Sequence, residues 1–253
     1  MSEALACQRL GMRGPRVALL HGWGWDGRLL APLTRALGTH CRVVQPDLPG
    51  YGRNLDVSCS AFDECVDLLL PVLDGADVLA GWSLGGLLAI ACAQRLSVRR
   101  VALIGATPCF MQAPGWPDGM TEERFNAFAD ALDEQPQRRR TRFAALSALG
   151  DHDARSVRAA MASLLEVPPQ PAPAALTQGL AWLRDQDRRP ALAELRAKLF
   201  FLHGEQDRVV SAAAARAAAQ SSGARWHAVP GAGHLPWLRG GATVLRDWVC
   251  ADD

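Results

Sequence analysis

Gly81-Trp82-Ser83-Leu84-Gly85-Gly86 is the stretch that decides the fold of this chain. Residues 77–80 before it can form a short buried strand, and residues 87–93 after it can begin a helix. A Gly-x-Ser-x-Gly pattern at a strand-to-helix turn is typical of a nucleophile elbow, because the glycines keep Cβ atoms away from the neighbouring chain. The pattern therefore predicts that Ser83 points its hydroxyl into a cleft, beside helix-opening amides that favour developing negative charge.

Composition limits what the rest of the chain can be. A chain with 23 glycines also produces Gly-x-Ser-x-Gly by chance, so an ordinary glycine turn stays open at this point. The 253 residues are 49% hydrophobic and 21% charged, which predicts one globular unit with a sizeable core. Lys and Arg total 27 against 26 Asp and Glu, so the overall charge favours neither nucleic acid nor an anionic membrane as a partner.

No cofactor or metal is expected from the sequence. Seven cysteines are scattered without a Cys-x-x-Cys pair, which argues against a disulfide framework and a zinc site. No Gly-x-Gly-x-x-Gly opens a helix after a strand. Residues 1–6 lack a basic segment followed by an apolar one, and no apolar run reaches the roughly 18 residues of a membrane span. A cytoplasmic protein is expected.

A glycine loop follows the apolar run Arg16 to Leu20. Its sequence is His21-Gly22-Trp23-Gly24-Trp25. In serine hydrolases such a loop supplies a backbone N–H to the oxyanion hole, and Trp23 is the candidate donor. For His21, a loop histidine that ties down its own backbone is favoured over a catalytic role. The two tryptophans suit either the core or the wall of an acyl pocket.

Strand and helix patterns alternate over most of the chain. Helices are predicted at 29–37 and 62–73, a strand followed by a turn over 41–52, and a strand at 99–104. This alternation predicts an α/β fold with a mostly parallel sheet, helices on both faces and active residues at the carboxyl ends of strands. Asp47 follows one such end, but Asp-Leu-Pro-Gly is turn chemistry and favours a structural role.

A helical insertion is predicted between residues 111 and 189, where prolines break helical stretches and strand patterns are absent. We expect it to be a lid, with 1–110 and 190–253 forming the core. Basic residues gather in this insertion: Arg138, Arg139, Arg140, Arg142, Arg155 and Arg158. A solvated helix surface is the favoured interpretation. The alternative is a docking surface for an acidic or phosphorylated partner, because guanidinium groups suit such partners. Apolar residues at helical spacing follow, as lid core or as the wall of an acyl channel: Phe143, Ala144, Leu146 and Leu149.

The sheet pattern resumes at Leu199, and its loops carry a candidate acid and base. Asp207 is favoured over Glu205 as the acid, because a carboxylate just beyond a strand end can accept Nδ1–H from a histidine and fix its tautomer. His203 precedes a glycine at the strand end and reads as structural. His234, in a loop before the closing helix, is the candidate general base. The chain order of serine, acid and histidine matches that of α/β-hydrolases.

Together these segments resemble the α/β-hydrolase superfamily across the whole chain. The resemblance rests on the His-Gly-Trp-Gly loop, residues 47–53, the serine elbow, Gly-Glu-Gln-Asp at 204–207 and the Gly-Ala-Gly-His loop. It implies a catalytic triad of Ser83, Asp207 and His234. It also implies that the amides of Trp23 and Leu84 form the oxyanion hole.

Within that superfamily the chain is similar to the pimeloyl-acyl-carrier-protein methyl ester carboxylesterases of biotin synthesis. The similar residues are 81–87, Thr-Pro-Cys-Phe at 107–110, Trp-Pro at 116–117 and Arg-Phe-Ala-Ala-Leu at 142–146. We expect a monomer. The resemblance implies a serine esterase whose acyl site, besides the catalytic and oxyanion residues, is lined by Phe143, Ala144, Ala145, Leu146 and Ser147. It also implies docking of an acidic carrier protein by arginines that match Arg138, Arg142 and Arg155, and we add Arg158 as a further docking candidate. The basic pattern departs from that family at Arg139, Arg140, Arg158 and Ala159.

Three other functions stay open. A broad short-chain carboxylesterase would have no carrier partner, and its arginines would be a solvated face. A lyase or C–C hydrolase of the same superfamily would share fold and triad. A binding protein without activity would not need the ordered serine, acid and histidine.

Overall fold

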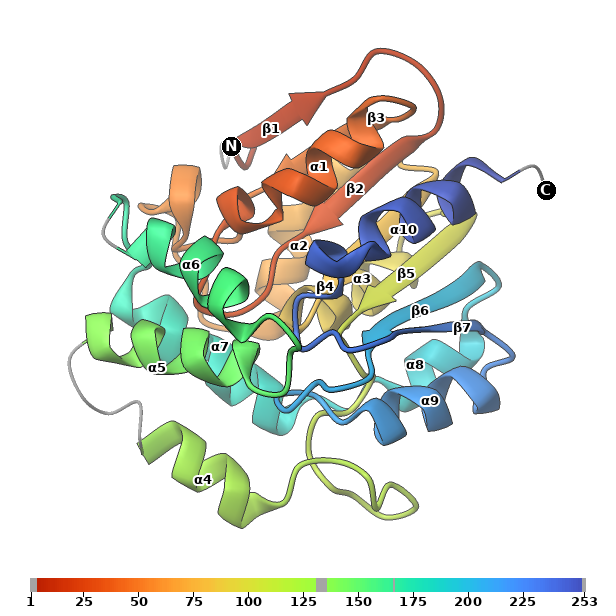
Figure 1. The fold of residues 1–253 in the computed structure, drawn as a ribbon. Helices are drawn as coiled ribbons and strands as arrows, with labels where there is room; N and C mark the ends of the chain where they lie inside the picture. The colour runs from red at the N-terminus through yellow and green to blue at the C-terminus, as the bar shows by residue number, and fades with distance from the viewer. Residues whose placement is uncertain (1–3, 131–135, 166, 252–253) are drawn as a thin grey trace.

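The predicted strands, together with an N-terminal strand that the sequence analysis missed, form one seven-stranded sheet in the computed structural model, which describes residues 4–130, 136–165 and 167–251 (Figure 1). The strands are β1 (Cys7–Leu10), β2 (Arg16–Leu20), β3 (Arg42–Pro46), β4 (Val78–Trp82), β5 (Arg100–Ile104), β6 (Lys198–Gly204) and β7 (Arg225–Val229). Their order is β1-β3-β2-β4-β5-β6-β7. Only β1 pairs antiparallel to its neighbour, so the predicted α/β fold with a mostly parallel sheet is confirmed.

Helices cover both faces of this sheet. α1 and α10 pack against each other on one face, and α2, α3 and α8 lie on the other (Figure 1). The helices of the core are α1 (Ala31–Gly38), α2 (Phe62–Leu73), α3 (Leu84–Ala93), α8 (Arg189–Glu194), α9 (Ala212–Ser221) and α10 (Gly241–Cys250). Every residue of β4, β5 and α3 is buried, as expected for central elements of a sheet that is covered on both faces.

Four further helices lie between β5 and β6: α4 (Glu122–Asp130), α5 (Pro136–Ala148), α6 (Ala154–Leu165) and α7 (Pro173–Asp185). α5 and α6 pack together, and α6 contacts the short helix η1 (Gly27–Leu30) that follows β2 (Figure 1). This group therefore stands over the carboxyl ends of the strands. None of the helices in the described part of the chain is long and apolar enough to cross a membrane.

The strand order reverses between β2 and β4. The chain passes from β2 outward to β3 and then returns to pair β4 on the other side of β2. In open α/β sheets, ligands bind in the crevice at such a switch point, outside the carboxyl ends of the strands. The loops that follow β2 and β4 are the two that carry the predicted oxyanion amide and the predicted nucleophile.

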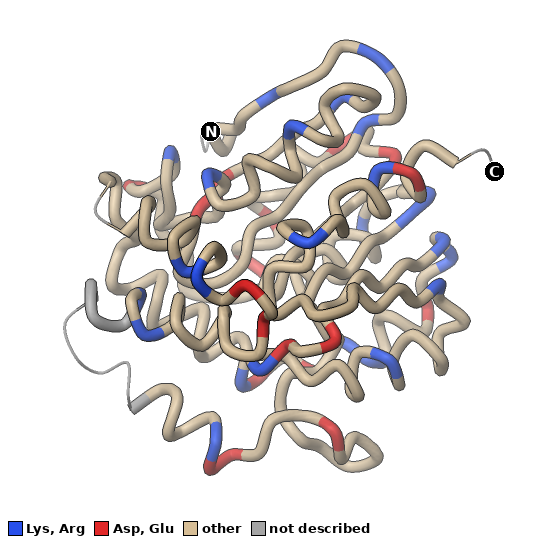
Figure 2. Tube along the Cα trace, in the orientation of Figure 1, with Lys and Arg blue, Asp and Glu red and all other residues tan. Residues whose placement is uncertain are grey.

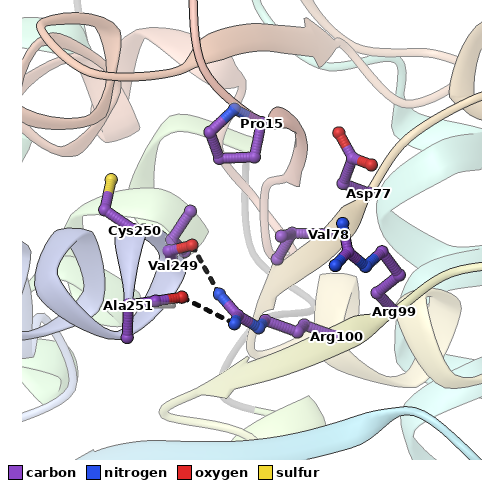
Figure 3. Close-up of a pocket in the computed structure, with 8 residues that line it drawn as sticks. All are labelled: Pro15, Asp77, Val78, Arg99, Arg100, Val249, Cys250 and Ala251. Carbon is purple, nitrogen blue, oxygen red and sulfur yellow. Dashed lines mark hydrogen bonds between the residues drawn. The ribbon is translucent and has the colours of Figure 1, made fainter. Parts of the chain in front are cut away.

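The other end of the sheet, where the parallel strands begin, has a structural role. A cavity of about 290 Å³ there is lined by the beginnings of β4 and β5 and by the end of α10 (Figure 3). Arg100 donates hydrogen bonds to the carbonyls of Val249 and Ala251, which holds the last turn of α10 against the sheet (Figure 3). Because the chemistry-bearing loops lie at the other edge, this cavity is not the candidate active site.

Candidate active site

Ser83 lies in a strained turn between β4 and α3. Its φ of +54° and ψ of −119° make it the one non-glycine residue with positive φ in the described part of the chain. A Cβ on Gly81 would approach the Gly85 carbonyl oxygen to 2.1 Å, and one on Gly85 would approach the Leu20 oxygen to 2.5 Å. Both glycines are therefore required by close packing. α3 begins at Leu84, three residues before the helix start predicted from sequence, so the amide of Leu84 is already at a helix N-terminus.

Asp207 and His234 are in direct contact. Asp207 Oδ2 accepts a hydrogen bond from His234 Nδ1 over 2.8 Å, and its Oδ1 accepts the backbone N–H groups of Val209 and Val210 over 2.8 and 3.0 Å. Burial raises the pKa of this carboxyl, but the charge of His234 and hydrogen bonds from His203 and His234 outweigh burial and lower the pKa below its ordinary value. The acid is therefore an ionised acceptor that fixes the histidine tautomer.

A second buried histidine shares the same carboxylate oxygen. His203 Nε2 lies 3.3 Å from Asp207 Oδ2 and 3.2 Å from the carbonyl oxygen of Val210, and its ring stacks on Trp226. Sequence reasoning gave His203 only a structural role and did not place it on the acid. Glu205, the rival acid, is exposed to solvent.

His234 is positioned beside the serine elbow by contacts on its backbone and ring. Trp82, the residue before Ser83, donates its indole N–H to the carbonyl of His234 over 3.0 Å and packs its ring 5.2 Å from the imidazole. The His234 amide donates to the Ser147 carbonyl over 3.2 Å. His234 Nδ1 keeps its proton and donates it in the hydrogen bond to Asp207, so Nε2 is left as a buried acceptor. Among the described residues this Nε2 has no hydrogen-bond partner.

Two backbone amides at the elbow and in the neighbouring loop have no internal acceptor. Within the described residues, no hydrogen bond is formed by the N–H groups of Trp23 and Leu84. The loop after β2 touches the elbow, because a Cβ on Gly22 would lie 3.0 Å from Ser83 Cβ. Ser83 itself is 6% exposed, so a substrate carbonyl at this position would be largely shielded from water.

His21 ties the loop after β2 to the loop after β3, as sequence reasoning favoured. Its Nδ1 lies 2.9 Å from the carbonyl of Gly22, and its Nε2 accepts the N–H of Leu48 over 2.9 Å, which requires the neutral ring with the proton on Nδ1. Asp47 also has the expected structural role, since its carboxylate accepts the N–H groups of Gly27 and Arg53.

The buried neutral state of His21 predicts a loss of stability in mild acid. Burial lowers its pKa, although Asp47, the Gly22 carbonyl and Asp26 raise it in part. A depressed native pKa means that the unfolded chain binds more protons below the ordinary histidine value of about 6.5, so stability is complete above that pH and falls below it. We expect the Tm of His21→Asn to be lower than wild type at pH 8 but to fall less between pH 7.5 and 5.5.

Differential scanning calorimetry across that pH range checks this prediction. The exposed residue His40 supplies the control, because His40→Asn should keep the wild-type pH dependence. Equal slopes for wild type and His21→Asn would contradict the role assigned to His21.

The residues predicted to line an acyl site are only partly brought together. Phe143 is buried with its ring 5.1 Å from that of Trp23 and 6.3 Å from that of His234, and Ser147 is buried beside His234. Ala144 is buried and Leu146 half-buried, whereas Ala145 is exposed on the outer side of α5. The five consecutive residues cannot all face one site, because successive helical residues point about 100° apart.

An apolar cavity of about 290 Å³ adjoins this cluster. Its wall is formed by Phe110, Met120, Arg124, Ala127, Phe128, Arg142, Leu146, Arg208 and Val209. Phe128 packs 6.0 Å from both Trp23 and Phe143, so one layer of side chains separates the cavity from the candidate oxyanion loop. Sequence reasoning missed Phe128, whose signal was its position on an amphipathic stretch in the insertion.

The predicted basic surface is divided by the fold. Arg142, Arg155 and Arg158 are exposed, and the side chain of Arg138 lies outside the described ones. Arg140 is 2% exposed, so its inclusion in a positive surface was wrong. Elsewhere, acidic and basic residues are interspersed along the chain (Figure 2). Across the described residues there is no group of three or more His, Cys, Asp or Glu side chains that could hold a metal ion.

Comparison with known proteins agrees with this geometry. Residues 17–246 match the model of the alpha/beta hydrolase family. A pimeloyl-[acyl-carrier protein] methyl ester esterase of Xanthomonas oryzae pv. oryzae is 38% identical over 227 residues, which cover 89% of this chain and 90% of that protein. The esterase of the same name from Aromatoleum aromaticum is 37% identical over 235 residues, covering 90% and 94%.

Solved structures share the fold at lower sequence identity. An esterase from Exiguobacterium antarcticum superimposes with a TM-score of 0.84 at 21% identity, covering 98% of this chain and 96% of that one. An enol-lactonase from Burkholderia xenovorans gives a TM-score of 0.81 at 19% identity, covering 98% and 96%. Because different activities occur on this one fold, the structural likeness shows architecture alone.

Proposed function

Because the chain belongs to the alpha/beta hydrolase family, we propose that it is a serine carboxylesterase that hydrolyses the methyl ester of pimeloyl-[acyl-carrier protein], a step of biotin synthesis. The observation that carries the chemistry is the buried Asp207–His234 pair at 2.8 Å, held beside the strained Ser83 elbow. The relatives that are 37–38% identical over about nine-tenths of the chain support the choice of substrate. We place this activity in the cytoplasm.

The reaction proceeds in two steps through an acyl-enzyme. His234 Nε2 takes the proton of Ser83 as Oγ attacks the ester carbonyl, and Asp207 stabilises the imidazolium that forms. The developing oxyanion is held by the amides of Trp23 and Leu84. His234 then protonates the departing methanol. Water then gives a proton to the same imidazole and attacks the acyl carbonyl. The bond between the acyl carbon and Ser83 Oγ breaks, His234 returns the proton to Oγ, and the carboxylate product is released.

The insertion at 111–189 supplies the lid over this site, and 1–110 with 190–253 supply the hydrolase core. The apolar cavity beside Phe128 and Leu146 accommodates acyl methylenes, since its wall is mostly apolar and Phe128 in that wall packs against Trp23 of the oxyanion loop. Exposed arginines at its rim and on α6 dock the acidic carrier protein, because guanidinium groups pair with carboxylates and phosphates. These are Arg142, Arg155 and Arg158, together with Arg138.

Carrier dependence is tested by comparing two substrates. We expect kcat/KM for the carrier-bound methyl ester to exceed that for a short free ester, and the ratio to fall at least tenfold in an Arg138→Ala/Arg142→Ala/Arg155→Ala variant, mainly through KM. Losing several rim charges weakens encounter and docking rather than bond cleavage. Steady-state kinetics at low and high salt check this, because the wild-type ratio should also fall as salt rises.

Arg216 provides the matched control. It is exposed on α9, outside the lid, so Arg216→Ala should leave the ratio unchanged. A ratio near one for wild type and triple variant alike would instead establish a broad short-chain carboxylesterase, in which the lid arginines are only a solvated surface.

A further inference from the structure

Arg140 is a buried cation that the proposed chemistry does not use. It lies on α5 with 2% of its surface exposed, and among the described residues no carboxylate lies within ion-pair distance of it. Burial lowers its pKa to about 10, with the neighbouring Arg28 adding to this and Asp26 and Tyr51 opposing it. The side chain therefore stays protonated at neutral pH. Because a buried charge is costly unless its donors are used, its partners are informative.

The donors of Arg140 are directed at the loop after β2 and at the far end of the lid. Its Nε donates to the carbonyl oxygen of Gly24 over 3.0 Å, and its guanidinium lies 4.6 Å over the ring of Trp25. Its Nη1 donates to the Gln170 side chain. One side chain of the lid thus holds two consecutive residues of the loop that carries the candidate oxyanion amide.

Three side chains fix the peptides around that amide. The ring of His21 holds the carbonyl of Gly22, whose peptide contains the amide of Trp23. On the other side, the N–H of Gly24 donates to Tyr51 Oη over 3.4 Å, and its carbonyl accepts from the Arg140 side chain. Gly24 has φ +77° and no side chain to restrict its backbone. Its position is therefore set by the hydrogen bonds that it makes to other residues.

A second contact joins the same loop to the same part of the lid. Buried Asp26 forms an ion pair of 2.7 Å with the partly exposed Arg28, which also donates to the carbonyl oxygens of Pro168 and Pro169 over 3.0 and 3.1 Å. The segment that follows α6 is therefore attached to the loop after β2 at two points, through Arg28 and through the contact of Arg140 with Gln170.

We propose that Arg140 is a positioning residue for the oxyanion hole. Arg140 binds the Gly24 carbonyl and thereby sets the direction of the nearby Trp23 amide. The same side chain thus fixes both the position of the lid on the loop after β2 and the position of the oxyanion donor. This inference rests on the proposed serine esterase mechanism. It differs from carrier docking, because the guanidinium is buried and directed inward.

The test uses Arg140→Met, which keeps the apolar stem and removes every donor. With p-nitrophenyl butyrate as substrate, kcat should fall about 10- to 100-fold while KM stays within about twofold, since a displaced donor weakens the transition state rather than ground-state binding. The affinity for a trifluoromethyl ketone, whose adduct with Ser83 presents an oxyanion, should fall by the same factor. Active-site titration normalises each rate to competent enzyme.

Arg140→Lys and Arg216→Met complete the design. Lysine keeps the charge with one donor group, so Arg140→Lys should lie between wild type and Arg140→Met in both kcat and ketone affinity. Arg216→Met, exposed on α9, should match wild type. If Arg140→Met does not fold, Arg140→Lys provides the test, because its kcat and its affinity for the ketone should fall together.

Two results separate the failures. If wild type hydrolyses the ester and the folded Arg140 variants have unchanged kcat and unchanged affinity for the ketone, the positioning role alone is overturned. Absence of wild-type turnover of any ester overturns the proposed function. A fall in Tm or in titratable sites with normal kcat per site would show that Arg140 only stabilises the fold.

Discussion

Ser83→Ala is expected to lower kcat for ester hydrolysis by about 10⁶-fold, because it removes the atom that forms the acyl-enzyme. The elbow should persist. Gly81 and Gly85 still permit the turn, and the packing of β4 and α3 does not involve the hydroxyl. Stopped-flow and steady-state assays with p-nitrophenyl butyrate give the rate, and circular dichroism gives the fold. Covalent labelling by a fluorophosphonate should be lost in parallel.

The comparison variant is Ser163→Ala, an exposed serine on α6 whose hydroxyl contacts only its own helix. It should keep wild-type turnover and labelling. Turnover of Ser83→Ala near the wild-type rate, in protein free of wild-type contamination, would show that another nucleophile acts and would remove the proposed mechanism.

Asp207→Asn should give the second largest loss, about 10⁴-fold in kcat, with KM little changed. The carbonyl of asparagine can keep the N–H groups of Val209 and Val210, so its amide group then faces His234 Nδ1. That arrangement favours the tautomer with the proton on Nε2, where the imidazole can no longer accept the serine proton. Loss of the carboxylate also removes the charge that stabilises the imidazolium.

Steady-state kinetics of Asp207→Asn and of a matched control variant check this prediction. Glu205→Gln is the matched control, since Glu205 is the exposed acid of the same loop. If Glu205→Gln lost more activity than Asp207→Asn, the assignment of the acid would be wrong.

The sequence alone was enough for the sheet and for the chain order of the site. Apolar runs such as Arg16–Leu20 and Arg100–Ile104 became buried parallel strands, because continuous apolar runs this short are typical of strands rather than helices in an α/β pattern. The glycines around Ser83 predicted the tight turn because close approach of backbone leaves no room for a Cβ. Such signals are local, so they can be read without the fold.

Only the tertiary structure decided where the lid side chains point. Within α5, Arg140 turns inward to the loop after β2 while Arg142 is exposed, and Ala145 faces solvent between buried Ala144 and half-buried Leu146. Arginine composition predicted a single basic surface, yet the direction of each side chain depends on the rotation of the helix against residues more than a hundred positions away, such as Gly24. The contact of Asp207 with His234 has the same origin, because it joins two loops that lie 27 residues apart. The contact of Asp207 with His203 is local, since the two residues are four positions apart, and only the fold shows that both histidines meet one carboxylate oxygen.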